Sequence, residues 1–250
     1  MRYVLLLLAA LMITASASAA EPDYRLWQEL LSKHYDPAKG MNYKGLKADK
    51  AALDRLRQQM AAVDVASLSR PEQLAYWINL YNISTVNVVA EKYPVESIRD
   101  ISTDPVVRLN VFKKPNVKVK GGTMSLNDVE NDKIRAGFKD PRIHFAINCA
   151  AESCPPIRSE PFVGARIDQQ LDDQARKFLN GPKGVRVEQD ALHVTKIMDW
   201  FKDDFEQWGG GTLPFLKKYL SPDKVKRIGA AKKFEIEFDD YSWKLNDTSR

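Results

Sequence analysis

The residues best suited to chemistry are the two cysteines of this 250-residue chain, Cys149 and Cys154. Four residues separate them in the segment Cys-Ala-Ala-Glu-Ser-Cys-Pro-Pro, so a loop that curls back brings the two sulfurs within bonding distance. The segment has two interpretations: the cysteines form a disulfide, or one of them is a free thiolate that acts as a nucleophile. A disulfide that closes such a short loop is itself either structural or a redox centre.

His144 is the candidate proton carrier for either thiol. It lies five residues before Cys149, in a segment whose alternating pattern predicts a strand. Residues five apart on a regular strand point to opposite faces. We therefore expect that the strand breaks before Cys149 or that the imidazole serves Cys154 after the loop returns. A histidine on a central strand is also compatible with a purely structural role.

Glu130 is a candidate acid on a helix. It falls on the same stripe as Leu126 and Ile134, at four-residue steps. A carboxylate on this apolar stripe has two explanations. It pairs with a cation such as Arg135 or Arg142, or it is a functional acid whose pKa is raised by burial.

Asn79 and Asn82 are polar side chains in a strongly apolar helical segment. They lie three residues apart and so share one face of the helix. Burying two amides costs free energy unless each finds hydrogen-bond partners. The two amides therefore bind neighbouring backbone groups, or they contact a substrate.

Charge and histidine content predict few other partners. The three histidines are scattered and show no paired spacing typical of a metal site, so we expect no metal and no cofactor. The 38 basic residues exceed the 33 acidic ones by a small margin that is spread along the chain, which does not predict nucleic-acid binding. We expect a monomer that binds a small molecule or a peptide.

Helical patterns dominate the first part of the chain. Apolar residues at three- and four-residue spacing predict short helices around residues 27–31 and 53–63. The segment Ser-Arg-Pro-Glu at 69–72 is a capping box with an early proline, and it predicts a helix that runs to Tyr93-Pro94. Apolar residues occupy every face of that segment, so we expect a buried central helix that carries both asparagines.

Strand patterns appear after about residue 100. They predict a hairpin over 117–124, a central strand over 143–149, a second hairpin over 185–194 and a closing strand over 234–238. Further helices are expected after Ser125, over 167–179 and after Thr195. The predicted fold class is α+β: a single compact domain whose N-terminal helices and buried central helix pack on a small, mainly antiparallel sheet.

The first 20 residues predict a signal peptide. Arg2 is followed by an apolar run over residues 4–13 and then by small residues up to Ala20. This run is shorter than the roughly 20 residues that span a bilayer, and no other stretch is long enough, so no integral membrane segment is expected after cleavage. Residues 21–250 are expected to form one domain in the periplasm or outside the cell, where nearby thiols often pair.

Several blocks occur in one order along the chain. They are Tyr-Trp-Ile-Asn-Leu-Tyr-Asn at 76–82, Ser-Leu-Asn-Asp-Val-Glu at 125–130, Asp-Pro-Arg-Ile-His-Phe-Ala at 140–146 with the cysteine loop, Trp-Phe at 200–201 with Asp-Phe at 204–205, and Tyr-Ser-Trp-Lys-Leu-Asn at 241–246. In these blocks the chain resembles the domain of unknown function 547 family. The resemblance implies one domain over about residues 22–248. The family's usual Glu-His pair is Glu130-Asn131 here, so a mechanism that needs that histidine does not carry over.

These residues suggest three classes of function. The sharpest hypothesis is a thiol enzyme, papain-like or transglutaminase-like, that transfers acyl groups or hydrolyses amides. In it one cysteine attacks the amide, His144 moves the proton, one asparagine orients the imidazole or holds the oxyanion, and Glu130 supports the network. The alternatives are a non-catalytic binding or structural module with a Cys149–Cys154 disulfide, and a dithiol redox protein, which lacks the usual two-residue spacer here.

Overall fold

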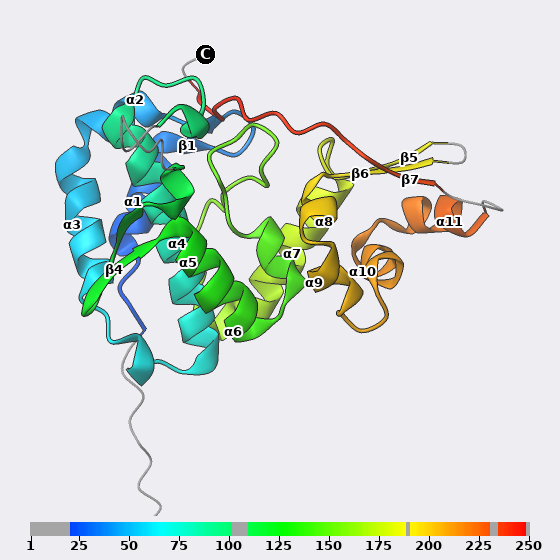
Figure 1. The fold of residues 1–250 in the computed structure, drawn as a ribbon, viewed down its shortest axis with the longest axis horizontal. Helices are drawn as coiled ribbons and strands as arrows, with labels where there is room; N and C mark the ends of the chain where they lie inside the picture. Colours follow the sequence, from blue (N-terminus) through cyan, green and yellow to red (C-terminus); the bar gives the residue numbers. More distant parts are fainter. Residues whose placement is uncertain (1–20, 102–109, 189–190, 231–234, 249–250) are drawn as a thin grey trace, which may run out of the picture.

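The computed structural model describes residues 21–101, 110–188, 191–230 and 235–248 (Figure 1). The segment predicted to be a signal peptide lies outside these residues. Helices predominate and strands are few and short, which confirms the α+β class. No helix in the described part of the chain is both long enough and apolar enough to cross a membrane.

The N-terminal part is a group of helices around one central helix. Helices α1 (Arg25–His34), α2 (Tyr43–Ala48) and α3 (Lys50–Ala61) contact one another, and α2 and α3 contact α4 (Arg70–Lys92). The helices predicted around residues 27–31 and 53–63 correspond to α1 and α3, and their apolar stripes are buried. Short 3-10 helices connect the longer elements: η1 (Val65–Ser67), η2 (Ile98–Asp100), η3 (Val111–Lys113) and η6 (Gly164–Arg166).

Helix α4 is the predicted buried central helix. Ser69 and Glu72 form the capping box at its start, and the helix ends before Tyr93-Pro94. Every residue from 74 to 90 is buried. A helix that is apolar on all faces is stable only when it is covered on all sides, so α4 fixes the positions of its neighbours.

The middle of the chain carries the predicted hairpin and the acid. Strands β3 (Pro115–Val119) and β4 (Gly122–Ser125) pair in antiparallel fashion around Gly121, whose φ of +85° suits a glycine turn. Ser125 and Asp128 then cap α5 (Leu126–Asp128). The chain continues as a π-helical stretch, η4 (Val129–Arg135), and as α6 (Ala136–Phe138). Glu130 therefore lies in a π-helical stretch, a form that often marks functional sites.

The C-terminal part begins with the predicted helix α7 (Ile167–Asn180) and the predicted hairpin of β5 (Val185–Glu188) and β6 (Ala191–Val194). The single helix expected after Thr195 is instead two short helices, α8 (Ile197–Trp200) and α9 (Lys202–Glu206). They are followed by α10 (Thr212–Tyr219), α11 (Pro222–Ala230) and the closing strand β7 (Glu235–Phe238). Phe234, included in the predicted strand, lies outside the described residues.

In the described part of the chain the strands form three small sheets, where one sheet was predicted. They are β1 (Tyr35–Asp36) with β2 (Gly40–Met41), β3 with β4, and β5–β6–β7. Most pairs are antiparallel, as expected, but β7 lies parallel to β6. Each sheet is too small to organise the fold alone, so the helices provide most of the packing.

The central strand predicted over residues 143–149 is wrong. The segment forms a 3-10 helix, η5 (Pro141–Phe145), which Asp140 caps and a proline begins. Beyond it, the Asn82 side chain donates to the Ala146 carbonyl at 3.0 Å and accepts from the Asn148 N–H at 2.8 Å. The Asn82 side chain of α4 thus satisfies backbone groups that a neighbouring strand would otherwise bind. The alternating apolar residues of this segment reflect burial on several sides and not membership of a sheet.

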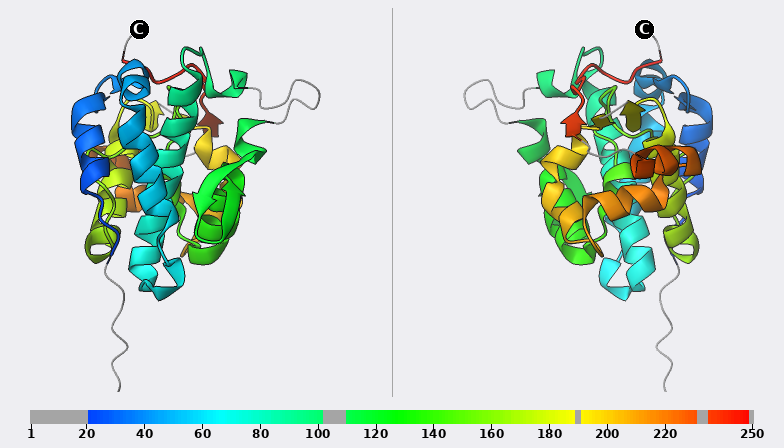
Figure 2. Two further views of the ribbon diagram at one scale, coloured as in Figure 1. Left: turned by 90° about the vertical axis from the view of Figure 1, so that its left-hand side faces the viewer. Right: turned by 90° about the vertical axis from the view of Figure 1, so that its right-hand side faces the viewer.

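The apolar core has two parts, and the end of the chain joins them. One part surrounds α4, and the other lies among α7, β5, β6 and α10. After β7 the chain runs back to the N-terminal helices (Figure 1). Both views in Figure 2 show this last segment, in red, ending at the top of the molecule. The Asn246 N–H donates to Ala150 at 3.1 Å, and the Thr248 N–H donates to Met41 at 3.1 Å. This return fixes Tyr241 beside the cysteine loop.

Candidate functional site

Four of the six candidate residues line one pocket of about 190 Å³. These are Glu130 from η4, His144 from η5, and both cysteines from the loop that follows. Further lining residues come from α4, η3, α8 and the C-terminal segment. Six aromatic side chains complete most of its wall: Tyr81, Phe112, Trp200, Phe201, Tyr241 and Trp243.

Cys149 and Cys154 form a disulfide with an S–S distance of 2.06 Å. Cys149 is partly exposed, whereas Cys154 is buried. The Cys149 N–H donates to Cys154 Sγ at 3.0 Å, and the Tyr241 hydroxyl lies 3.0 Å from each sulfur. Because neither sulfur of a disulfide carries a proton, the hydroxyl is the donor. The pair is therefore joined, and thiol attack on an amide would first require its reduction.

His144 is oriented by an aspartate from α9. Its Nε2 lies 2.7 Å from Asp204 Oδ2, and its ring stacks on Phe201 with 3.9 Å between ring centroids. Burial lowers the pKa of His144, although the Asp204 carboxylate acts in the opposite direction. A neutral ring that donates from Nε2 leaves a lone pair on Nδ1, and this buried nitrogen has no partner among the described residues.

Asp204 also binds Arg135. The Arg135 guanidinium donates to both carboxylate oxygens, at 2.7 and 3.0 Å, and to Asn131 Oδ1 at 2.6 Å. Burial alone would raise the pKa of Asp204, but the bonds from His144 and Arg135 hold it well below its usual range. The aspartate is thus a fixed negative charge behind the imidazole.

Glu130 makes no ion pair within the described part of the chain. The Tyr81 hydroxyl donates to its Oε2 at 3.3 Å. Burial raises the pKa of Glu130 to about 7, against the Tyr81 bond and the Arg135 charge, which lower it. The predicted ion pair is therefore wrong, because Arg135 binds Asp204 and Arg142 binds three aspartates. The alternative, an acid whose pKa is raised by burial, describes this side chain.

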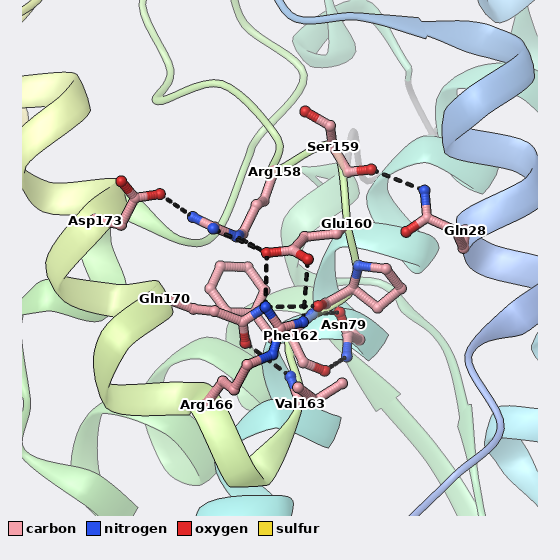
Figure 3. A network of polar contacts seen from close by, with 11 residues as sticks. Gln28, Asn79, Arg158, Ser159, Glu160, Phe162, Val163, Arg166, Gln170 and Asp173 are labelled. Atoms are coloured by element: carbon pink, nitrogen blue, oxygen red, sulfur yellow. Dashed lines mark hydrogen bonds and ion pairs between the residues drawn. The ribbon is translucent and has the colours of Figure 1, made fainter.

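Asn79 and Asn82 do not line the pocket. Asn79 donates to the Phe162 carbonyl at 2.7 Å and accepts from the Phe162 N–H at 3.0 Å (Figure 3). Asn82 binds the backbone before the cysteine loop in the same way. The interpretation of these amides as cross-links between the helix and neighbouring backbone is confirmed.

The segment that Asn79 holds is also tied to α7. Gln170 donates to the Pro161 carbonyl at 2.9 Å and accepts from the Val163 N–H at 2.9 Å, and Arg158 binds Glu160 beside it (Figure 3). This network joins α4 to α7 through backbone groups. It contributes no group to the pocket lining.

Sequence reasoning missed several groups of this site. Asp204, Tyr81 and Tyr241 contact the candidate residues directly, and Trp200 and Trp243 line the pocket. All five lie in the blocks at 76–82, 200–205 and 241–246, so the resemblance contained the signal. Periodicity could not reveal them, because contacts between residues 49 to 92 positions apart depend on the tertiary fold.

Together these groups define what the pocket can do chemically. It holds a disulfide that can accept electrons, a neutral imidazole, and a carboxyl group that exchanges its proton near neutral pH. In the described residues, no group of three or more histidine, cysteine, aspartate or glutamate side chains is arranged to hold a metal ion.

The comparisons with known proteins give one match. No curated protein and no solved structure matched the chain. A family model matches residues 65–179, which include Tyr81, Glu130, His144 and both cysteines but not Asp204 or the C-terminal aromatic residues. Residues 65–179 thus match the family described as "Protein of unknown function, DUF547", the same family that the sequence blocks resemble.

Proposed function

We propose that this chain is an exported protein that performs thiol–disulfide exchange at Cys149–Cys154, on a small ligand bound in the aromatic pocket. The observation that carries the proposal is the position of the disulfide. Both sulfurs line a pocket, and donors already surround the sulfur that would leave. A purely structural disulfide needs neither feature.

The first step is attack by a ligand thiolate on the partly exposed Cys149 Sγ. A bond forms between the ligand sulfur and Cys149, the Cys149–Cys154 bond breaks, and its electron pair goes to Cys154 Sγ. The Cys149 N–H and the Tyr241 O–H, each 3.0 Å from that sulfur, stabilise the new thiolate. Burial raises the pKa of Tyr241, so its hydroxyl remains a donor at neutral pH.

The second step releases the oxidised ligand. A second ligand thiolate attacks the ligand sulfur of the mixed disulfide, and Cys149 leaves as a thiolate. Two ligand thiols have then been oxidised to a disulfide, and the protein disulfide has been reduced to two thiols. The reduced protein takes up two protons overall, and Glu130, whose pKa is about 7, can relay protons within the pocket.

Trapping the mixed disulfide tests this mechanism. In a Cys154→Ser variant the free Cys149 should react rapidly with 2-hydroxyethyl disulfide and retain one half of it, which mass spectrometry detects. The matched Cys149→Ser variant should react at least about tenfold more slowly, because Cys154 is 6% exposed. Equal rates for the two variants would contradict exchange at Cys149.

Acyl transfer by the reduced protein is a second candidate. It is favoured by the His144–Asp204 pair, because an aspartate orients Nε2 and leaves Nδ1 available as a base in the same pocket as the thiols. A reduced protein of this kind should hydrolyse a p-nitrophenyl ester, and alkylation of the thiols or the change His144→Ala should abolish the activity. Hydrolysis that is unaffected by oxidation to the disulfide would contradict this candidate.

Export is part of the proposal. The composition of residues 1–20 supports it, and residues 21–250 are proposed to be the mature domain. Mass spectrometry of the protein recovered from an exporting bacterial host should show an N-terminus after Ala19 or Ala20. An intact N-terminus in the cytosolic fraction would contradict export.

A further inference from the structure

We infer that the aromatic pocket binds a small organic ammonium ion, with Glu130 as its counter-charge and Trp200, Tyr241 and Trp243 as its wall. This inference rests on the proposed function in one respect: it makes the exchange partner a thiol that carries an ammonium group. Binding of the ammonium ion itself needs no exchange chemistry, so the two ideas can be tested apart.

The charge of the pocket lining favours a cation. Among the described lining residues, Glu130 is the one acidic side chain, and there is no lysine or arginine. His144 is the other titratable group apart from tyrosines, and burial lowers its pKa, so it is neutral at pH 7. The joined cysteines do not titrate. An anionic ligand would therefore meet no counter-charge here, and an ammonium ion would meet one.

The aromatic wall supplies a second attraction. The centroid of Tyr241 lies 4.7 Å from that of Trp200 and 4.9 Å from that of Trp243. Trp200 is 45% exposed, so much of its ring is accessible at the pocket. The faces of aromatic rings attract cations. The protein already uses this attraction at the same wall, where the Arg99 guanidinium lies 5.1 Å from the Trp243 ring.

Glu130 is not neutralised by the protein itself. Arg135, the cation whose charge acts on Glu130, is held by two bonds to Asp204, so these two side chains form a nearly neutral pair. The charged and titratable groups around Glu130 come from each adjoining element: Tyr81 of α4, Arg135 of η4, His144 of η5, Asp204 of α9 and Tyr241 of the C-terminal segment. None of them supplies an uncompensated positive charge.

The size of the pocket limits the ligand. A volume of about 190 Å³ is smaller than the roughly 300–1,000 Å³ typical of sites for drug-sized molecules. It suits a compact headgroup, such as a primary or quaternary ammonium with a short tail. An aminothiol has this size and places its sulfur within a few bonds of the charge.

Proton linkage follows from the same geometry. An ammonium ion favours the ionised form of Glu130, whose pKa burial raises to about 7 in the empty pocket. Binding therefore releases a proton when it occurs below pH 7. The affinity should rise from pH 6 to pH 8, by roughly tenfold if Glu130 alone is responsible, and it should level off above that range.

Choline and its neutral isostere 3,3-dimethylbutan-1-ol test the inference directly. Both are titrated into the oxidised protein at pH 6 and pH 8, with tryptophan fluorescence and calorimetry as readouts. Choline should bind at least about tenfold more tightly than the isostere at pH 8. Glu130→Gln should abolish this preference and its pH dependence, Trp200→Leu should weaken choline binding, and the exposed-site control Glu29→Gln should change neither. Equal binding of the two compounds, or a preference that survives Glu130→Gln, would overturn the inference.

Exchange kinetics separate this inference from the proposed function. The disulfide is reduced with cysteamine, 2-mercaptoethanol or mercaptoacetate at equal thiolate concentrations. Cysteamine should be fastest and mercaptoacetate slowest. If choline binds but no thiol opens the disulfide, the proposed exchange is wrong and the ammonium site stands. If all three thiols react equally and choline does not bind, the exchange stands and the ammonium site is wrong.

Discussion

At the scale of the residue, the pocket depends on two carboxyl groups with opposite behaviour. Glu130 is partly buried beside aromatic rings without an ion-pair partner among the described residues, and its pKa is raised to about 7. Asp204 accepts bonds from His144 and Arg135, and its pKa is lowered. Sequence reasoning anticipated the first from the stripe of residues 126, 130 and 134. It could not anticipate the second, because Asp204 lies 60 positions from His144.

Glu130 should make the stability of the protein depend on pH. Its unfolded pKa is near 4.5 and its folded pKa is about 7, so between these values the folded protein holds a proton that the unfolded chain has lost. Raising the pH through this window therefore lowers the free energy of unfolding. Relative to Glu130→Gln, the wild type should lose roughly 1–3 kcal/mol between pH 4.5 and pH 7. Urea unfolding at several pH values measures the difference, and parallel curves for the two proteins would contradict it.

Asp204 should be important for stability as well as orientation. Asp204→Asn leaves the Arg135 guanidinium without its carboxylate and weakens the bond to His144. We expect a loss of about 1–3 kcal/mol, which is below the cost of breaking a fully buried pair because both side chains of this ion pair are partly exposed. The neighbouring exposed Asp203 provides the control, since Asp203→Asn should change the free energy of unfolding by less than about 0.5 kcal/mol. Equal losses in the two variants would contradict the assigned role.

At the scale of the element, α4 positions the cysteine loop through Asn82. Its capping box and uniformly apolar faces were predictable from sequence because they are local features. The segment over 143–149 was not predictable, because its backbone partners come from a side chain of α4 and not from a neighbouring strand. Local alternation records which residues are buried, but not which element buries them.

Removing the Asn82 amide should destabilise the loop. Asn82→Ala leaves the Ala146 carbonyl and the Asn148 N–H without this partner in a buried region, at a cost of about 2–4 kcal/mol in total. The disulfide should also become easier to reduce, because the loop loses its anchor. Asn87→Ala is the matched control from the same helix, since Asn87 binds Glu91 of α4 and no part of the loop. Thermal unfolding and the rate of reduction by dithiothreitol measure both effects, and an Asn82→Ala protein that resembles Asn87→Ala in both would contradict this account.

At the scale of the whole molecule, the pocket lies where segments distant in sequence meet. It takes residues from α4, η4, η5, the cysteine loop, α8 and the C-terminal segment. Sequence reasoning identified the two cysteines, His144 and Glu130 and the α+β class, because each is recognised from local residue types and spacing. The aromatic wall was not recognised, because it forms only when the end of the chain returns past β7 to the N-terminal helices.

The returning segment should hold the pocket closed. A chain that ends at Asp240 lacks Tyr241 and Trp243 and the backbone bonds to Ala150 and Met41. We expect a lower Tm and a disulfide that thiols reduce faster, because exposure of both sulfurs should outweigh the loss of the Tyr241 hydrogen bond to Cys154 Sγ. A chain that ends at Thr248 should resemble the full-length protein. Differential scanning calorimetry and thiol-trapping kinetics provide the readouts. Unchanged reduction kinetics in the shorter chain would show that the segment does not shield the sulfurs.

The central claim is that the Cys149–Cys154 disulfide is a working group of the pocket. Its reduction potential tests this most directly, measured by equilibrating the mature protein with dithiothreitol buffers and trapping free thiols for mass spectrometry. The account predicts a potential more positive than about −300 mV, in the range of disulfides that exchange with thiols. A value clearly below about −300 mV would place the bond among structural disulfides and contradict the claim.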